Sequence, residues 1–206
     1  MSDDWFRNRD WNAAIARRFD EKLRRARRKE QYLRIQASTL AQTHPAIALE
    51  LLDRYFQLPD DFDHARAHVD RATAYQALGR IEEAARGYEA ALKREVVFPQ
   101  LLTQAYLEFP MLVATQRLVA RYDQALTVLK AHSDKPMFPV DKFLWHTAHA
   151  LILTAMGNSG DASIHAAQAL DAASLDKSGF QHHPSVGLVT EKHRELFKTL
   201  AGVSAA

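Results

Sequence analysis

The stretch that decides the fold is residues 72–92, which read ATAYQALGRIEEAARGYEAAL. It consists almost entirely of strong helix formers, and the break between the two helices is expected at Gly79-Arg80. Ala72 and Ala84 would allow two helices to approach closely, and Tyr75 and Tyr88 would fill the space beside them. The stretch therefore predicts two packed helices that are joined by a short turn.

This stretch resembles a tetratricopeptide repeat (TPR). The resemblance holds residue by residue: small, aromatic and turn positions of the family are occupied here by Ala72, Tyr75, Gly79, Ala84, Tyr88 and Ala91. The whole chain, with Asp4-Trp5 and Asp10-Trp11 near its start, also resembles an uncharacterised bacterial protein family, and that resemblance implies no activity.

Weaker copies of the same pattern occur elsewhere in the chain, at residues 45–55, 121–129 and 150–170. Their anchoring alanines are Ala48, Ala84, Ala125 and Ala162, which are separated by 36, 41 and 37 residues. These separations are close to the roughly 34 residues of a TPR with small insertions. The resemblance implies a superhelix of about four helix pairs over residues 29–175, with a concave ligand surface. An unrelated α-helical bundle is the alternative.

The rest of the chain also predicts an all-α protein with a single TPR-like domain over residues 1–206. Apolar periodicity and the Pro and Gly positions predict helices at 11–28, 30–42, 45–57, 62–78, 81–94, 100–119, 121–132, 140–156, 160–173 and 187–200. The first of these, with Asp10 as its N-cap, would cap one end of the repeats as part of residues 1–28. Residues 176–206, an irregular segment and a last helix, would cap the other end.

Composition narrows the class of protein. The chain has 206 residues, 47% of them hydrophobic, and no cysteine, so disulfides and thiolate metal sites are excluded. Its start lacks the apolar core of a signal peptide, and its longest apolar run, 148–156, falls far short of the roughly 20 residues of a membrane span. We therefore expect a cytoplasmic protein without a membrane partner.

Charge is distributed unevenly. Residues 1–34 contain 11 Lys and Arg against 6 Asp and Glu, whereas residues 35–206 contain 16 against 19. The basic cluster of residues 17–29 is interrupted by acidic residues and has no aromatic side chains in its densest part, which disfavours a surface that stacks single-stranded bases. A solvated helix face is favoured, and nucleic-acid binding through this helix is an alternative.

Histidine is frequent, with 10 residues. His146 and His149 are one helical turn apart, and His182 and His183 lie in an irregular segment, so the four suggest a metal or small-ligand site, or an enzyme that uses them. A packing role for His146 is the other interpretation. No phosphate loop, nucleophile elbow or zinc-protease motif occurs, so we expect neither an enzyme nor a cofactor.

The favoured hypothesis is a non-catalytic adaptor that binds another protein or peptide, with an acidic ligand and homo-oligomers as further options. In the TPR family the ligand lies along the concave groove. Carried over by position, the groove residues would be Arg66, Thr73, Gln76, Ala114, Arg117, Thr147 and Leu151. The two arginines matter most, because a guanidinium group in a groove suits a carboxylate.

Overall fold

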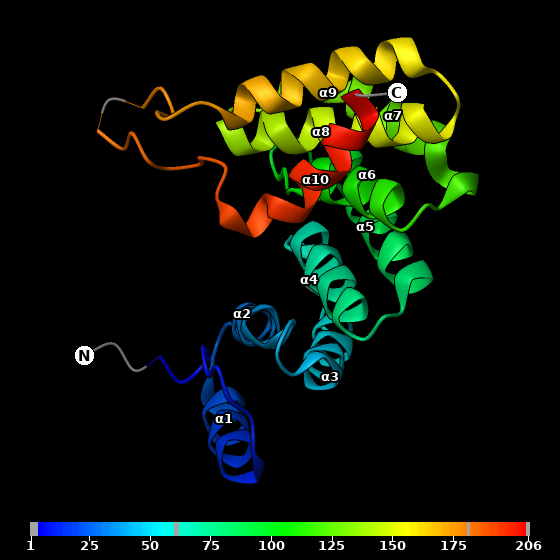
Figure 1. Cartoon of the computed structure of the whole chain (residues 1–206). Helices are drawn as coiled ribbons and strands as arrows, with labels where there is room; N and C mark the ends of the chain where they lie inside the picture. The colour runs from blue at the N-terminus through cyan, green and yellow to red at the C-terminus, as the bar shows by residue number, and fades with distance from the viewer. Residues whose placement is uncertain (1–3, 60–61, 181, 205–206) are drawn as a thin grey trace. The chain divides into compact units, whose positions relative to one another are not determined.

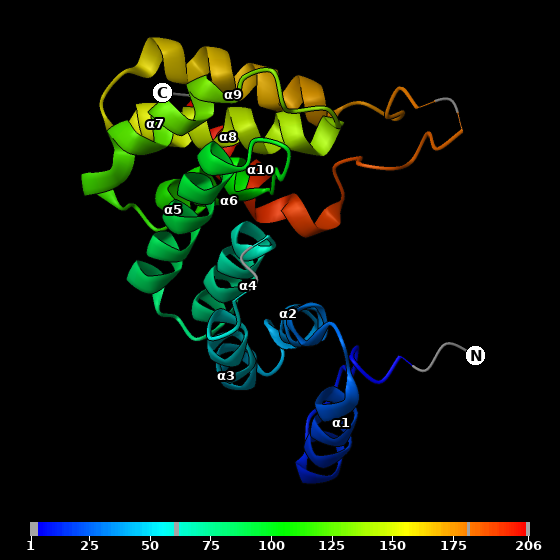
Figure 2. The ribbon, with the colours of Figure 1, turned by 180° about the vertical axis from the view of Figure 1, so that it is seen from behind.

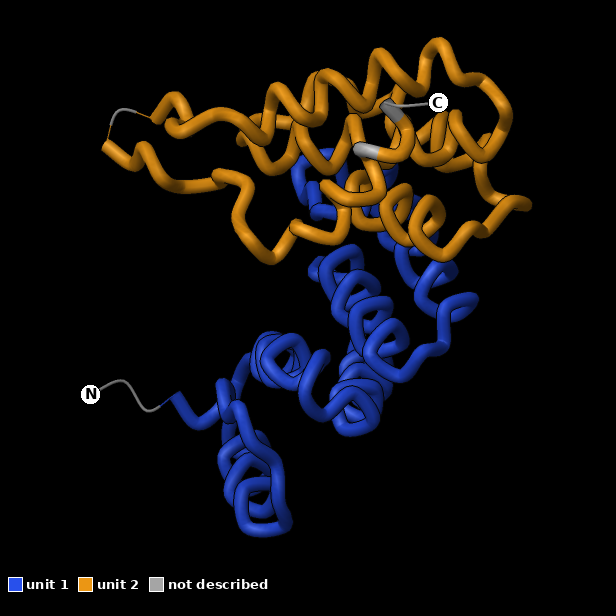
Figure 3. Tube along the Cα trace, viewed as in Figure 1, with its two compact units in different colours: residues 1–105 blue, residues 106–206 orange. Residues whose placement is uncertain are grey.

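The computed structural model describes residues 4–59, 62–180 and 182–204. All regular elements in this part of the chain are helices, so the all-α prediction is confirmed (Figure 1). The chain divides into two compact units, residues 1–105 and 106–206, which are described separately (Figure 3). The single TPR-like domain expected from the sequence stays a prediction. None of the described helices is long and apolar enough to cross a membrane.

The described residues of unit 1 form five α-helices, which follow the predicted order. They are α1 (Ala13–Arg25), α2 (Lys29–Leu40), α3 (Pro45–Phe56), α4 (His64–Ala77) and α5 (Ile81–Val97). The closest neighbours are α4 with α5 and α2 with α3, and α3 also packs on α4. The predicted N-cap of α1 was wrong: the side chain of Asn12, not Asp10, accepts hydrogen bonds from the amides of Ala14 and Ile15.

The segment before α1 is attached to α2 by a buried amide. The Gln36 side chain is fully buried, and its Nε2 donates to the carbonyl of Asn8 at 2.8 Å. Its Oε1 accepts from both the backbone N and the Nδ2 of Asn8, at 3.0 and 2.8 Å. Rings of Trp5 and Trp11 pack on Phe19 of α1. These contacts cover the apolar face of α1.

The other five described α-helices belong to unit 2. They are α6 (Ala105–Thr115), α7 (Tyr122–Ala131), α8 (Pro139–Ala155), α9 (Ser159–Ala173) and α10 (Arg194–Ser204). Helices α8 and α9 form the closest pair, and α10 packs on both of them. The ring of Tyr106 in α6 stacks on that of His132, which directly follows α7, with centroids 5.5 Å apart. The described residues between α9 and α10 form no α-helix, and this segment extends away from both helices (Figure 2).

Two predicted helices have different bounds in the structure. The helix expected at 100–119 begins at Ala105 and ends at Thr115, because Glu95 accepts hydrogen bonds from Thr103 in the preceding loop and the chain turns at Arg117. The helix expected at 187–200 begins at Arg194, after a 3₁₀ turn at Glu191–His193.

Small residues allow the paired helices to lie close together. The four anchoring alanines, Ala48, Ala84, Ala125 and Ala162, are all buried. Gly87 of α5 lies against Ala72 of α4, and a Cβ added at Gly87 would be 2.9 Å from the Cβ of Ala72. That distance is too short for two carbon atoms, so only glycine fits at this contact.

We predict that Gly87→Ala destabilises unit 1, although alanine is the better helix former. Overpacking against Ala72 should lower the free energy of unfolding by about 1–3 kcal/mol, measured by chemical denaturation. Gly160→Ala in α9 is the matched control, because nothing lies within 4 Å of its added Cβ. There the same substitution should be neutral or stabilise by up to about 1 kcal/mol. Equal effects at both positions would mean that α4 and α5 are not in close contact.

Candidate functional site

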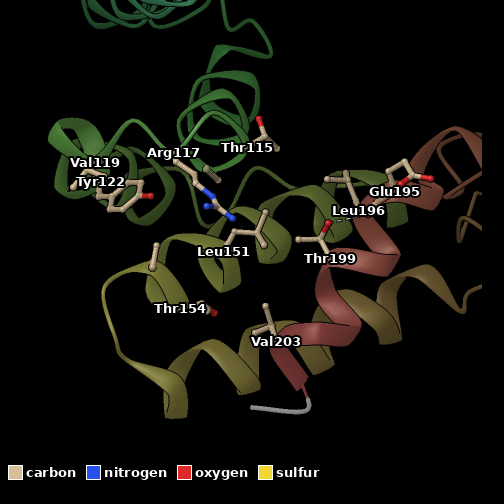
Figure 4. Close-up of a pocket in the computed structure, with 12 residues that line it drawn as sticks. Thr115, Arg117, Val119, Tyr122, Leu151, Thr154, Glu195, Leu196, Thr199 and Val203 are labelled. Carbon is tan, nitrogen blue, oxygen red and sulfur yellow. Dashed lines mark hydrogen bonds between the residues drawn. The ribbon is translucent and has the colours of Figure 1, made fainter.

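The candidate site is a hollow in unit 2 with a volume of about 720 Å³. The end of α6 and the turn that follows it form one side, and α8 and α10 form others (Figure 4). Its lining residues are Ala114, Thr115, Arg117, Val119, Tyr122, Leu151, Thr154, Ala155, Glu195, Leu196, Thr199 and Val203. The lining is largely apolar, with hydroxyls and one cation among its polar groups, as expected for a ligand site.

Arg117 occupies an unusual position in the backbone. It follows α6 with φ of 52°, and it is the only residue other than glycine with positive φ in the described part of the chain. Its amide donates to the carbonyl of Ala114, and the amide of Leu118 donates to the carbonyl of Val113. This pair of hydrogen bonds is a Schellman motif, in which the left-handed position is usually glycine.

Two other helix pairs use the same motif with the usual residue. Gly79, after α4, and Gly157, after α8, have φ of 71° and 80° and are followed by the same two types of hydrogen bond. A residue with a Cβ costs about 1–2 kcal/mol in the left-handed conformation. The turn after α6 therefore carries a strained arginine where the other two turns have glycine.

The Arg117 guanidinium is available to a ligand. It extends from the turn toward Leu151 (Figure 4). No carboxylate forms an ion pair with it among the residues that the structure describes. Glu195, which also lines the hollow, pairs instead with Lys198 at 2.7 Å. The hollow thus contains a guanidinium whose donors are unused by the described side chains.

Three threonine hydroxyls in the hollow have a fixed role. Those of Thr115, Thr154 and Thr199 donate to the carbonyl oxygens four residues earlier, at 2.7, 2.7 and 2.9 Å. A hydroxyl that donates its only proton to its own helix can present only lone pairs elsewhere. These three oxygens can therefore accept hydrogen bonds from a ligand, while Arg117 can only donate.

The structure brings three of the predicted groove residues together. Ala114, Arg117 and Leu151 all line the hollow, although they come from α6, the following turn and α8. The sequence predicted Arg117 to lie within a helix at 100–119, but in the structure it lies in the turn after α6. Thr147 of α8 does not line the hollow: its side chain is fully buried and donates to the carbonyl of Phe143.

The other predicted groove residues lie on α4 in unit 1. The Arg66 guanidinium pairs with Asp63 at 2.8 Å, and the Thr73 hydroxyl donates to the carbonyl of Val69. Gln76 accepts a hydrogen bond from the hydroxyl of Tyr88 at 2.6 Å. These side chains thus have partners within unit 1. A groove that joins them to the residues of unit 2 stays a prediction.

The sequence-predicted histidines form a different cluster from the one expected. His146 and His149 of α8 meet His165 of α9, which sequence reasoning missed. The Nδ1 atoms of His146 and His165 are 2.9 Å apart, and the rings of His149 and His165 stack with centroids 4.3 Å apart. His182 and His183 lie exposed in the segment between α9 and α10. No group of three or more His, Asp or Glu among the described residues could hold a metal ion.

These contacts suit uncharged imidazoles. A hydrogen bond between two Nδ1 atoms requires that one donates and the other accepts, so both cannot be protonated there. Burial, reinforced by the charge of neighbouring His165, lowers the pKa of His146 to about 4. Burial is also the main cause that lowers the pKa of His149 to about 4 and that lowers the pKa of His165. Lys142 opposes protonation of His146, whereas Asp161 favours protonation of His165.

We predict that this histidine cluster makes the protein less stable in acid. In the unfolded chain these residues regain a pKa near 6.5, so below that pH the unfolded state binds more protons than the folded state. The free energy of unfolding should therefore fall as pH decreases from about 6.5 to about 4, and the cluster should contribute no pH dependence above this range. Denaturation at a series of pH values measures this dependence.

The double variant His146→Gln with His149→Gln should show a shallower fall in stability over the same pH range. His182→Gln is the control, because His182 is exposed and lies outside the cluster. If the double variant keeps the wild-type dependence on pH, the cluster is not the source of acid sensitivity.

Comparison with known proteins identified no relative. No protein-family model matches the chain, and neither curated proteins nor solved structures show a significant similarity to it. The resemblance to TPRs stays a prediction, and the case for a function depends on the residues of this chain.

Proposed function

We propose that this protein is a non-catalytic adaptor that binds a protein or peptide through the hollow in unit 2, with Arg117 as the anchor for a carboxylate of the ligand. The observation that carries the proposal is the left-handed backbone of Arg117. The two comparable turns have glycine, Gly79 and Gly157, at this position. Strain in a backbone is retained where it serves a purpose, and here it directs a guanidinium into a hollow.

The chemistry of the hollow supports a peptide as the ligand. A guanidinium group has five N–H donors in a planar arrangement that matches both oxygens of a carboxylate. The threonine oxygens can accept from backbone amides, and Leu151, Leu196 and Val203 offer apolar surface to a side chain. A peptide supplies all three kinds of group: carboxylates, amide N–H donors and apolar side chains.

The helix pairs also support the proposal that the chain is TPR-like. The buried alanines at the anchoring positions and the repeated Schellman turns are consistent with repeats of one helix pair. A 3₁₀ turn, Val119–Arg121, lies between the second and third anchors, directly before α7, and fits their longer separation. In repeat proteins of this kind, stacked pairs provide surfaces for extended ligands.

We predict that Arg117→Gly weakens partner binding and leaves the fold intact. Glycine relieves the left-handed strain but makes the unfolded chain more flexible, so the free energy of unfolding should stay unchanged or rise by up to about 1 kcal/mol. The partner would be isolated by affinity purification from the native cell, and its affinity would be measured by calorimetry. A loss of at least about tenfold is expected for a charge-assisted bidentate contact.

Two further variants sharpen the test. Arg117→Lys keeps the charge but not the planar donors, so its affinity should lie between those of wild type and Arg117→Gly. Arg66→Glu, in unit 1, tests the longer groove expected from the sequence. Unchanged affinity in Arg117→Gly would reject the hollow as the binding site, whatever the result for Arg66→Glu.

A further inference from the structure

The first helix presents a cationic surface that the proposed adaptor function does not use. Seven basic residues at α1 and the start of α2 are exposed: Arg17, Arg18, Arg24, Arg25, Arg27, Arg28 and Lys29. Of these seven, only Arg28 forms an ion pair within the described chain, with Glu30 at 3.9 Å. The other six cations therefore have no carboxylate partner among the described residues, although the exposed residues Asp20 and Glu21 lie on the same helix, α1.

Part of this surface is hollow. A depression of about 340 Å³ is lined by Asp20, Leu23, Arg24, Lys29 and Arg54. Its one carboxylate is already bound, because Asp20 accepts from Nη2 of Arg54 at 2.9 Å. The lining keeps two more positive than negative charges, and α1, α2 and α3 each contribute a cation. Such a convergence of guanidinium and ammonium groups suits a phosphate group.

The apolar face of α1 is covered, and this distinguishes between an anionic membrane and a nucleic acid as the partner. A helix that binds at a lipid surface buries its apolar face in the membrane. In α1 that face is already packed, since Phe19 and Leu23 are buried and the tryptophan rings lie against Phe19. Only the charged face remains for a partner. The surface therefore fits a ligand that is recognised by its phosphates alone.

We propose that α1 and the start of α2 bind the phosphate backbone of double-stranded nucleic acid, without sequence preference. The surface offers cations for phosphates but no side chains arranged to read bases, and phosphate contacts carry no sequence information. Each phosphate that a cation neutralises releases counterions, so the affinity should decrease steeply as salt increases. This function is independent of the hollow in unit 2.

The test is binding of the full chain to labelled duplexes of about 20 base pairs, measured by fluorescence anisotropy from about 50 to 200 mM salt. Two duplexes of unrelated sequence should bind equally well. The double variant Arg24→Gln with Lys29→Gln removes two of the three cations that line the depression at α1. It should weaken binding by about tenfold or more at low salt, and it should reduce the slope of log affinity against log salt by nearly 2.

A matched control removes the same charge elsewhere. Lys192→Gln with Arg194→Gln also deletes two exposed cations, but in unit 2, where Arg194 pairs with Glu191. It should bind duplexes within about twofold of wild type, and so should Arg117→Gly. Circular dichroism of each variant would show that its helices are intact.

Three results would overturn the proposal. The first is no duplex binding at low salt, and the second is an equal loss of affinity in the two double variants. The third is binding to vesicles of anionic phospholipid together with none to duplexes, which would assign the surface to membranes. Failure here leaves the peptide proposal unaffected, because that proposal depends on Arg117 and a different assay.

Discussion

Close contact between helices at small residues is the constraint on which the rest of the structure depends. Gly87 of α5 has no room for a Cβ beside Ala72 of α4. In α9, Ala162, Ala166 and Ala169 are buried, and α8 contributes buried Ala150 to the same core. Since the backbones lie this close, small losses or gains of volume at these positions change the stability of a whole helix pair.

Close pairing also imposes a requirement on the turns. Two helices that pack tightly need a short connection, and the Schellman motif ends the first helix abruptly with one left-handed residue. Gly79 and Gly157 meet this requirement without strain. After α6 the connection is longer, because a 3₁₀ turn, Val119–Arg121, lies between the Schellman turn and α7. The turn with Arg117 is thus the one in which space for a ligand opens beside the connection.

Much of the fold could be predicted from the sequence, because its signals are local. Gly79 and Gly157 mark two helix ends, and the alanine spacing marks the packed faces. The end of α6 gave no such signal, since Arg117 replaces the glycine that would have revealed it. The loop before α6 was also missed, because the buried Glu95 that holds Thr103 contacts it from another element.

The candidate site was predicted only in part for the same reason. Ala114, Arg117 and Leu151 were chosen by their repeat positions, but the contributions of α10 could not be seen, because they depend on how the last helix packs. Similarly, His146 and His149 stand out by their spacing along one helix, whereas His165 comes from the next helix. Single-sequence reasoning finds residues that share one helix face, and it misses those that tertiary packing adds.

The distribution of carboxylates explains why Arg117 and most exposed cations of α1 have no carboxylate partner, in a chain with only two excess positive charges. Partly buried Arg34 is matched by Asp63 and Asp70, at 3.4 and 3.3 Å, and Arg80 is matched by Glu83. An exposed arginine without a partner costs little, because water solvates it. Lack of a partner is therefore weak evidence for a site when it stands alone. At Arg117 the lack of a partner coincides with a strained backbone. At α1 it coincides with a depression that is lined by cations from three helices. These second observations are the reason for assigning a function to each surface.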